Sequence, residues 1–218
     1  IYESPPGVYG LEDRITGARQ REQSLVFKFN NLAPGEAAAI QKSFMKEQDA
    51  IHYRELKMFV HGDDNIEVLS DSTSDVIFFF RFGQDENNYF EVREYLFPGW
   101  DERNELRIPL TRLSGLEFEF PETKGGYPEW GEGKFYRMVG NPTVRHIRVV
   151  TAGVINNSSG FKSGEVWMDE LRVSNVEKIK GIALRTRTEL TLADIGKLSA
   201  DLERKDAEFI CQQINSDK

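Results

Sequence analysis

The chain has 218 residues, of which 39% are hydrophobic, 29% are charged and 11% are aromatic. A chain of this length can bury a hydrophobic core, and we expect one large domain, or one domain with an appendage. The net charge of −8 gives no electrostatic attraction for nucleic acid. The single cysteine, Cys211, excludes a disulfide within the chain. No apolar run reaches the roughly 18 residues of a membrane helix.

The opening of the chain predicts an extended path that leads into the first strand. It starts at Ile1 without a methionine or signal peptide, so we expect a segment of a longer parent chain. A Pro-Pro-Gly run disfavours helix, and residues 1–23 are expected to be extended and then loop. Residues 25–30 alternate apolar and polar side chains, which predicts a half-buried strand.

The next segment carries the clearest helix signal in the sequence. Residues 36–44 are rich in alanine, and Ala37, Ile40 and Phe44 would share one face of a helix. That apolar face is narrow. We therefore expect one short helix that packs on the rim of a sheet or links two strands.

Short strand signals follow at regular spacing through the middle of the chain. Each is aromatic or β-branched and is bounded by Gly, Pro, Asn or Asp. The expected strands are residues 56–61, 76–82, 89–97, 105–110, 117–120, 134–139, 144–154 and 165–173. Residues 76–82 are apolar on both faces, which predicts a central strand. Many short strands separated by turns indicate an all-β sandwich or barrel, with residues 121–133 as a surface loop.

The pattern changes after a polar linker at residues 174–180. In residues 182–193 one set of alternate side chains is apolar or neutral, and the other set is largely charged. A turn at residues 194–196 leads into a second alternating run at residues 198–203. Strands of about ten residues with this alternation and a tight turn are typical of a transmembrane barrel hairpin. An ordinary soluble hairpin has the same pattern, so both interpretations stay open.

This change of pattern divides the chain into two predicted parts. Residues 1–176 form a β-sandwich domain. Residues 177–218 form a linker and a barrel-type β-hairpin, followed by a frayed tail where the alternation fades past Asp206.

Several motifs, met in order along the chain, are similar to segments of one protein family. Residues 164–173 resemble the family's GEVWVDELRL strand, and Leu192-Ala193-Asp194 falls where the family has an LAD turn. The other similar segments are residues 2–8, 22–25, 56–61 and 139–142. Together they resemble the SprA/Sov family, the giant outer-membrane translocons of type IX secretion and gliding motility.

The resemblance implies a structural role rather than a chemical one. It implies a soluble insertion domain of the jelly-roll, galactose-binding-like kind, followed by strands of a large barrel that conducts folded cargo proteins. The domain would act as a scaffold, a cap or a docking surface, with other outer-membrane secretion or motility components as partners. The alternative is a carbohydrate-binding jelly-roll module of a secreted protein.

The same resemblance sets the expected location of the domain. The parent chain would be embedded in the outer membrane of a Gram-negative bacterium. Bacterial barrels have short turns on the periplasmic side. If the turn at residues 194–196 is periplasmic, the sandwich lies on the extracellular side.

The sequence predicts no enzyme and no cofactor. Adjacent carboxylates such as Asp169 and Glu170 point to opposite faces of a strand, so they cannot share a site unless a bulge intervenes. The three histidines, His52, His61 and His146, lie in unrelated contexts without a nucleophile motif. No Cys/His cluster predicts zinc, no glycine loop predicts a nucleotide, and we expect no small-molecule substrate.

A structural calcium ion is the candidate metal, because jelly rolls often hold one near their termini. Glu3 and Asp169 are the candidate ligands. Asp169 shares strand parity with Trp167, on what we expect to be the core face, and a carboxylate there needs a partner. Hydrogen bonds or a salt bridge are the favoured partners, and a metal is the alternative.

Exposed aromatic residues would mark a ligand or partner surface. Trp100 and Trp130 lie beside loop signals and are the candidates for such a surface. Trp167, within a predicted strand, is expected to fill the core. A loop tryptophan could bind a carbohydrate or a protein, and it could also cap the core.

Overall fold

The computed structural model describes residue 5 and residues 24–113, 133–176, 183–192 and 196–205. The chain divides into two compact units, Ile1–Val176 and Glu177–Lys218. The predictions for residues 1–4, 6–23 and 117–120, and for most of the loop at 121–133, lie outside the described residues. No helix among the described residues is long and apolar enough to cross a membrane.

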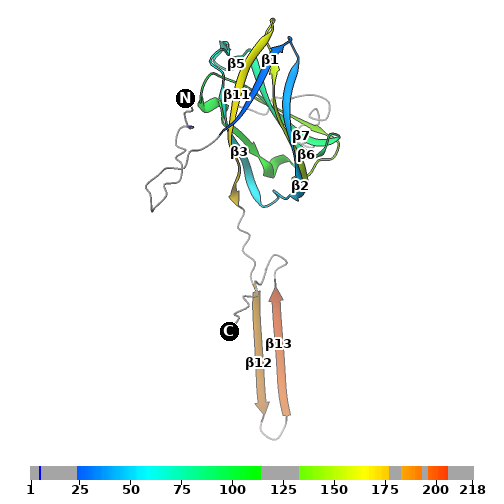
Figure 1. Cartoon of the computed structure of the whole chain (residues 1–218). Helices are drawn as coiled ribbons and strands as arrows, with labels where there is room; N and C mark the ends of the chain where they lie inside the picture. The colour runs from blue at the N-terminus through cyan, green and yellow to red at the C-terminus, as the bar shows by residue number, and fades with distance from the viewer. Residues whose placement is uncertain (1–4, 6–23, 114–132, 177–182, 193–195, 206–218) are drawn as a thin grey trace, which may run out of the picture. The chain divides into compact units, whose positions relative to one another are not determined.

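Two antiparallel sheets face each other in the first unit (Figure 1). The four-stranded sheet has the order β1 (Leu25–Leu32), β11 (Lys162–Val176), β3 (Tyr53–Gly62) and β8 (Leu106–Pro109). The five-stranded sheet has the order β2 (Ala37–Gln48), β10 (Ile147–Asn156), β6 (Val76–Asp85), β7 (Asn88–Tyr95) and β9 (Lys134–Val139). The short strands β4 (Val68–Ser70) and β5 (Thr73–Ser74) pair with each other. The all-β sandwich predicted from the sequence is therefore confirmed.

The core lies between the two sheets and follows the period-2 alternation of their strands. In β3 the buried side chains are Leu56, Met58 and Val60, while their neighbours are only partly buried. Strand β6 is buried on both faces: several of its phenylalanines lie between the sheets, and Phe79 is buried on the opposite face. Strand β6 is the middle strand of its sheet, as its two-sided apolar pattern predicts.

The helix predicted for residues 36–44 is wrong, because this segment forms β2. Ile40 and Phe44 are four residues apart, a spacing that suits one face of a helix and also one face of a strand. Pairing with β10 along most of its length decides the outcome and overrides the helix propensity of alanine. The one α-helix in the described part of the chain is α1 (Leu110–Leu113), which directly follows β8.

A β-bulge interrupts β11 at Glu170. Asp169 lies opposite Phe59, but the next residue pair joins Arg172 to Lys57, so β11 carries one extra residue. Glu170 accommodates the bulge with a φ of 48°. The side-chain parity of β11 therefore differs before and after this residue.

The second unit is a two-stranded hairpin, as the alternating pattern predicts. Strand β12 (Ala183–Leu192) pairs with β13 (Gly196–Lys205) without interruption, from Ala183 opposite Lys205 to Leu192 opposite Gly196. On one face Asp201 accepts hydrogen bonds at 3.1 Å from both Arg185 and Arg187. The predicted turn residues 194 and 195 lie outside the described residues.

Candidate functional site

An aromatic cluster lies on the outer face of the four-stranded sheet. The register places Trp167 of β11 opposite His61 of β3. Their rings stack with centroids 4.5 Å apart and planes 16° from parallel. Trp100 meets both rings edge-on, at 5.0 Å from His61 and 6.5 Å from Trp167. All three side chains are partly buried, so they form a continuous aromatic surface.

The expectation that Trp167 fills the core is wrong. Its neighbours Val166 and Met168 are the buried residues of this part of β11, with exposed fractions of 0% and 6%. Trp167 therefore points to the outer face of the sheet. There its indole N–H donates a hydrogen bond of 2.9 Å to Glu165. Lys28 hydrogen-bonds and ion-pairs with Glu165 at 3.1 Å, and with the indole it lowers the pKa of that carboxyl.

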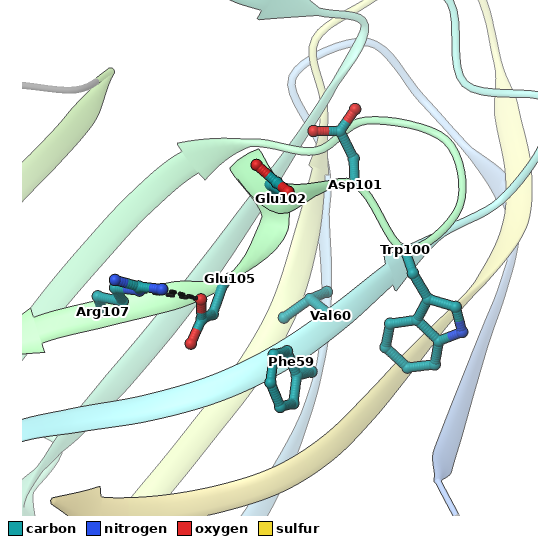
Figure 2. A pocket seen from close by; sticks show the side chains of 7 residues that line it. All are labelled: Phe59, Val60, Trp100, Asp101, Glu102, Glu105 and Arg107. Carbon is teal, nitrogen blue, oxygen red and sulfur yellow. Dashed lines mark hydrogen bonds and ion pairs between the residues drawn. The ribbon is translucent and has the colours of Figure 1, made fainter. Parts of the chain in front are cut away.

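Beside the cluster lies a hollow of about 550 Å³, which Figure 2 shows from close by. We call it the aromatic hollow. Its lining residues are Phe59, Val60, Trp100, Asp101, Glu102, Glu105 and Arg107. The first two come from β3. The next four come from the loop before β8 and its short 3₁₀ turn (Glu102–Asn104), and Arg107 comes from β8. The hollow therefore joins aromatic faces to three carboxylates and one guanidinium.

The loop that carries Trp100, residues 97–104, is held by a buried amide. The Asn104 side chain donates hydrogen bonds to the carbonyls of Phe97 at 2.7 Å and Gly99 at 3.0 Å. It also accepts a hydrogen bond of 2.8 Å from the N–H of Phe97. This one side chain thus satisfies three backbone groups of a tight loop, which fixes the position of Trp100.

Two glycines bring this loop against the end of β3. Gly62 and Gly99 exchange backbone hydrogen bonds of 2.8 and 3.2 Å. A Cβ at Gly62 would lie 2.2 Å from the carbonyl oxygen of Phe97, so no larger residue fits without movement of the backbone. Gly99 has a φ of 72°, the left-handed region that glycine adopts without strain.

Arg103 orders the acidic side of the hollow. Its guanidinium binds Asp101 with two hydrogen bonds of 2.6 and 2.8 Å and lies 3.5 Å from the ring centre of Phe97. The hydrogen bond from Arg103 holds the pKa of Asp101 below its usual range, and partial burial opposes this effect. Asp101 therefore stays ionised and oriented at the rim of the hollow.

Charged side chains from several elements hold Glu105 beside the hollow. Arg107 binds the carboxylate of Glu105, as the dashed line in Figure 2 marks. The guanidinium of Arg172 lies 4.8 Å from the ring centre of Phe59 and 4.0 Å from Glu105. Lys134 donates a hydrogen bond of 3.2 Å to the backbone carbonyl of Glu105 and so anchors the start of β8. The carboxylate of Glu105 is consequently held at the wall of the hollow.

Of the two calcium candidates, Asp169 alone lies among the described residues. Asp169 is 9% exposed and accepts hydrogen bonds from the Ser24 hydroxyl at 3.1 Å and from the Glu170 N–H at 2.8 Å. Those are hydrogen-bond partners of the kind that the sequence favoured. Glu3 lies outside the described residues. No group of three or more potential metal-ligating side chains occurs in the part of the chain that the structure describes.

Sequence reasoning found part of this site. Trp100 was predicted as a surface residue, and it lines the hollow. Trp130, the other candidate, lies outside the described residues. Phe59, Glu105 and Arg107 were missed, because only the pairing of β3 with β8 brings them together. The acidic run Asp101-Glu102 beside Trp100 was the available signal, but it is weak in a chain with 36 acidic residues.

Together these features define the class of protein as an all-β sandwich module joined in one chain to an amphipathic β-hairpin. The chain matches the SprA_N family, described as motility related/secretion protein, over residues 5–217, and it belongs to that family. The resemblance to the SprA/Sov family is thereby confirmed. Motility and secretion are functions of the cell envelope, and the family's description names no catalysed reaction. No curated protein matches the chain.

Proposed function

We propose that the chain is a non-catalytic part of an outer-membrane secretion translocon. The β12–β13 hairpin carries the proposal: two uninterrupted strands of ten residues form a unit separate from the sandwich. A charged row that includes Arg185, Arg187 and Asp201 lies on one face, and Leu202, opposite Thr186, lies on the other. This length and alternation suit strands of a barrel wall, with the charged face toward the lumen and the apolar face toward lipid.

The sandwich would then be the soluble insertion that precedes the barrel strands, and we infer that it docks a partner protein through the aromatic hollow. Of the three carboxylates that line the space beside the ring of Trp100, Asp101 is already bound by Arg103 and Glu105 by Arg107, and Glu102 forms no ion pair among the described residues. Such a lining favours a basic side chain of a partner, held by an ion pair to Glu102 and a cation–π contact with Trp100. A well-held aromatic anchor at the centre of a polar rim is the usual form of a protein interface.

The docking role can be tested in cells that depend on the parent chain for secretion. Trp100→Ala and Glu105→Gln are introduced into the parent chain, and cargo in the medium is measured beside the amount of parent chain in the outer membrane. Secretion should fall while the amount of parent chain stays constant. Phe161→Ala is the matched control, because Phe161 is an exposed aromatic that does not line the hollow. Undiminished secretion in both hollow variants would overturn the docking role.

The extracellular placement has its own test. Met45 is fully exposed on β2. In a Cys211→Ser background, Met45→Cys should react with a membrane-impermeant maleimide in intact cells. Labelling only after the outer membrane is permeabilised would place the sandwich in the periplasm instead.

The hollow also supports a second candidate function, carbohydrate binding. Trp100 offers a ring face for stacking on a sugar, and Asp101, Glu105 and Arg107 offer hydrogen-bonding groups around it. Isothermal titration calorimetry of the purified chain with cellohexaose and with chitohexaose tests this function. Saturable binding that is lost in Trp100→Ala and retained in Phe161→Ala would favour the sugar. If neither oligosaccharide gives a heat of binding, and Trp100→Ala and Glu105→Gln reduce secretion, the results would favour the docking role.

A further inference from the structure

Within the part of the chain that the structure describes, strand β2 is an edge of the five-stranded sheet. Among the described strands it pairs with β10 alone, in unbroken register from Ala37 opposite Ile155 to Ser43 opposite Val149. In an antiparallel edge strand, every second residue turns its backbone N–H and C=O away from the one neighbour. This edge therefore presents a regular row of backbone donors and acceptors to an incoming strand.

An apolar groove of about 490 Å³ runs between β2 and the four-stranded sheet. Its lining residues are Leu25, Ile40, Gln41, Lys42, Met58, Phe80, Val150, Ala152, Met168, Asp169, Glu170 and Leu171. Leu25 and Leu171 leave 57% and 46% of their surface exposed. The bulge at Glu170 immediately precedes Leu171, and the groove reaches from that bulge to β2. A strand added to β2 would direct alternate side chains into this groove.

Lys42 is the charged side chain of β2 that lines the groove. In the described part of the sandwich, four lysines form ion pairs: Lys28, Lys57, Lys134 and Lys162. Lys42 and Lys46 form none there, and the Lys42 ammonium lies 5.9 Å from the ring centre of Phe44. A lysine directed into the groove from an edge strand opposes indiscriminate pairing. A strand that brings a carboxylate to Lys42 therefore pairs more favourably than one that brings an apolar or basic side chain.

We propose that β2 accepts an added strand from a partner polypeptide, an extended segment whose alternate side chains are apolar except for one carboxylate facing Lys42. The backbone of β2 would supply affinity, and the groove and Lys42 would supply selectivity. A second copy of the chain is a poorer occupant, because Glu47, the carboxylate of β2 itself, is already paired with His146 and Arg148. The site is separate from the aromatic hollow and does not depend on the translocon role.

The experiment uses the full chain and a capped seven-residue peptide, Val-Thr-Glu-Thr-Val-Thr-Val. Paired antiparallel to β2, its glutamate faces Lys42 and its valines face Ala38, Ile40 and Phe44. Binding is measured by fluorescence polarisation, and the site is located by amide hydrogen exchange. We expect saturable binding, with slower exchange confined to the β2 segment.

A charge swap tests the selectivity. Lys42→Glu should weaken binding of the glutamate peptide by about fivefold, the size of one exposed ion pair, and should strengthen binding of the same peptide with lysine in place of glutamate. Ser43→Glu is the matched control, since it adds the same charge at the neighbouring position on the opposite face of β2, and it should not reverse the preference. Equal affinity for both peptides, or no protection of β2, would overturn the proposal. Concentration-dependent dimerisation that protects β2 without peptide would overturn it in favour of a second copy.

Discussion

The indole of Trp167 and the imidazole of His61 lie face to face on the outside of the four-stranded sheet, with centroids 4.5 Å apart. The two residues are 106 positions apart in the chain and meet because β11 and β3 are paired in register. Trp100 closes the cluster from the loop before β8. The same three side chains therefore contribute to the stability of the sandwich and form part of its outer surface.

Trp167→Ala should destabilise the sandwich by roughly 2 kcal/mol, about half the loss expected for a fully buried tryptophan. The variant removes the stack on His61 and the hydrogen bond to Glu165. Trp167→Phe should recover part of the loss, because it keeps an aromatic face but not the indole N–H. Chemical denaturation of both variants checks this prediction, and equal stabilities of the alanine and phenylalanine variants would contradict it.

The sequence predicts that Trp167 fills the core, and this prediction rests on strand parity. Before the bulge the core side of β11 holds Val166 and Met168. After the bulge Val173 lies opposite the buried Leu56, so the register moves the face that Leu56 occupies to the other parity of β11, although Val173 itself is 39% exposed. Counting back from Val173 in steps of two leads to Trp167, which in fact faces outward. The inserted residue Glu170 cannot be recognised from composition, because it is an ordinary residue in a positive-φ conformation.

Most strands were predictable because they alternate with a period of two or, like β6, are apolar on both faces, and because they end at a turn residue. Strand β2 was not predictable in this way, because Lys42 lies at a groove-lining position where strict alternation would place an apolar side chain. That same interruption underlies the proposal of strand addition. The aromatic hollow was only partly predictable, because Phe59 and Glu105 come together through strand pairing, which the sequence does not specify.

Asn104→Ala should destabilise the chain by about 3 kcal/mol, since a buried backbone group without a partner costs about 1–3 kcal/mol. The Phe97 N–H and the Phe97 and Gly99 carbonyls would lose the Asn104 side chain as a partner. The loop at residues 97–104 should also become mobile, and Trp100 with it. Thermal unfolding measures the first effect and amide exchange of the loop measures the second. A stability loss with unchanged loop exchange would show that Asn104 does not position Trp100.

Asp101→Asn should make the stability of the chain less sensitive to acid. The hydrogen bond from Arg103 lowers the pKa of Asp101 in the folded chain. The carboxylate therefore contributes stability above its ordinary pKa of about 3.9, and this contribution is lost as the pH falls through the lower folded value. The effect should be under about 1 kcal/mol, because the pair is partly solvated. Urea unfolding between pH 2 and pH 6 should give a shallower acid limb for the variant than for the wild type, and parallel limbs would refute the assignment.

Glu94 and Lys134 form a buried ion pair of 3.0 Å near the start of β8, with the Lys134 ammonium also bound to the carbonyl of Glu105. Removing one partner leaves the other charge buried. Lys134→Met alone should therefore destabilise the chain by about 3–5 kcal/mol. The double variant Glu94→Leu with Lys134→Met should lie within about 2 kcal/mol of the wild type, because a well-packed apolar pair replaces the ions.

The pH dependence of the same pair distinguishes burial from simple charge attraction. Burial raises the pKa of Glu94, and Lys134 only partly offsets this effect. The folded chain therefore binds a proton at Glu94 more readily than the unfolded chain does. The resulting stability is fully present below the ordinary pKa of about 4.3 and is lost as the pH rises through the folded value. Glu94→Gln should remove this loss from the stability curve. An unchanged slope between the wild type and Glu94→Gln would mean that the pair titrates as an ordinary surface salt bridge, with Lys134 rather than burial setting the pKa of Glu94.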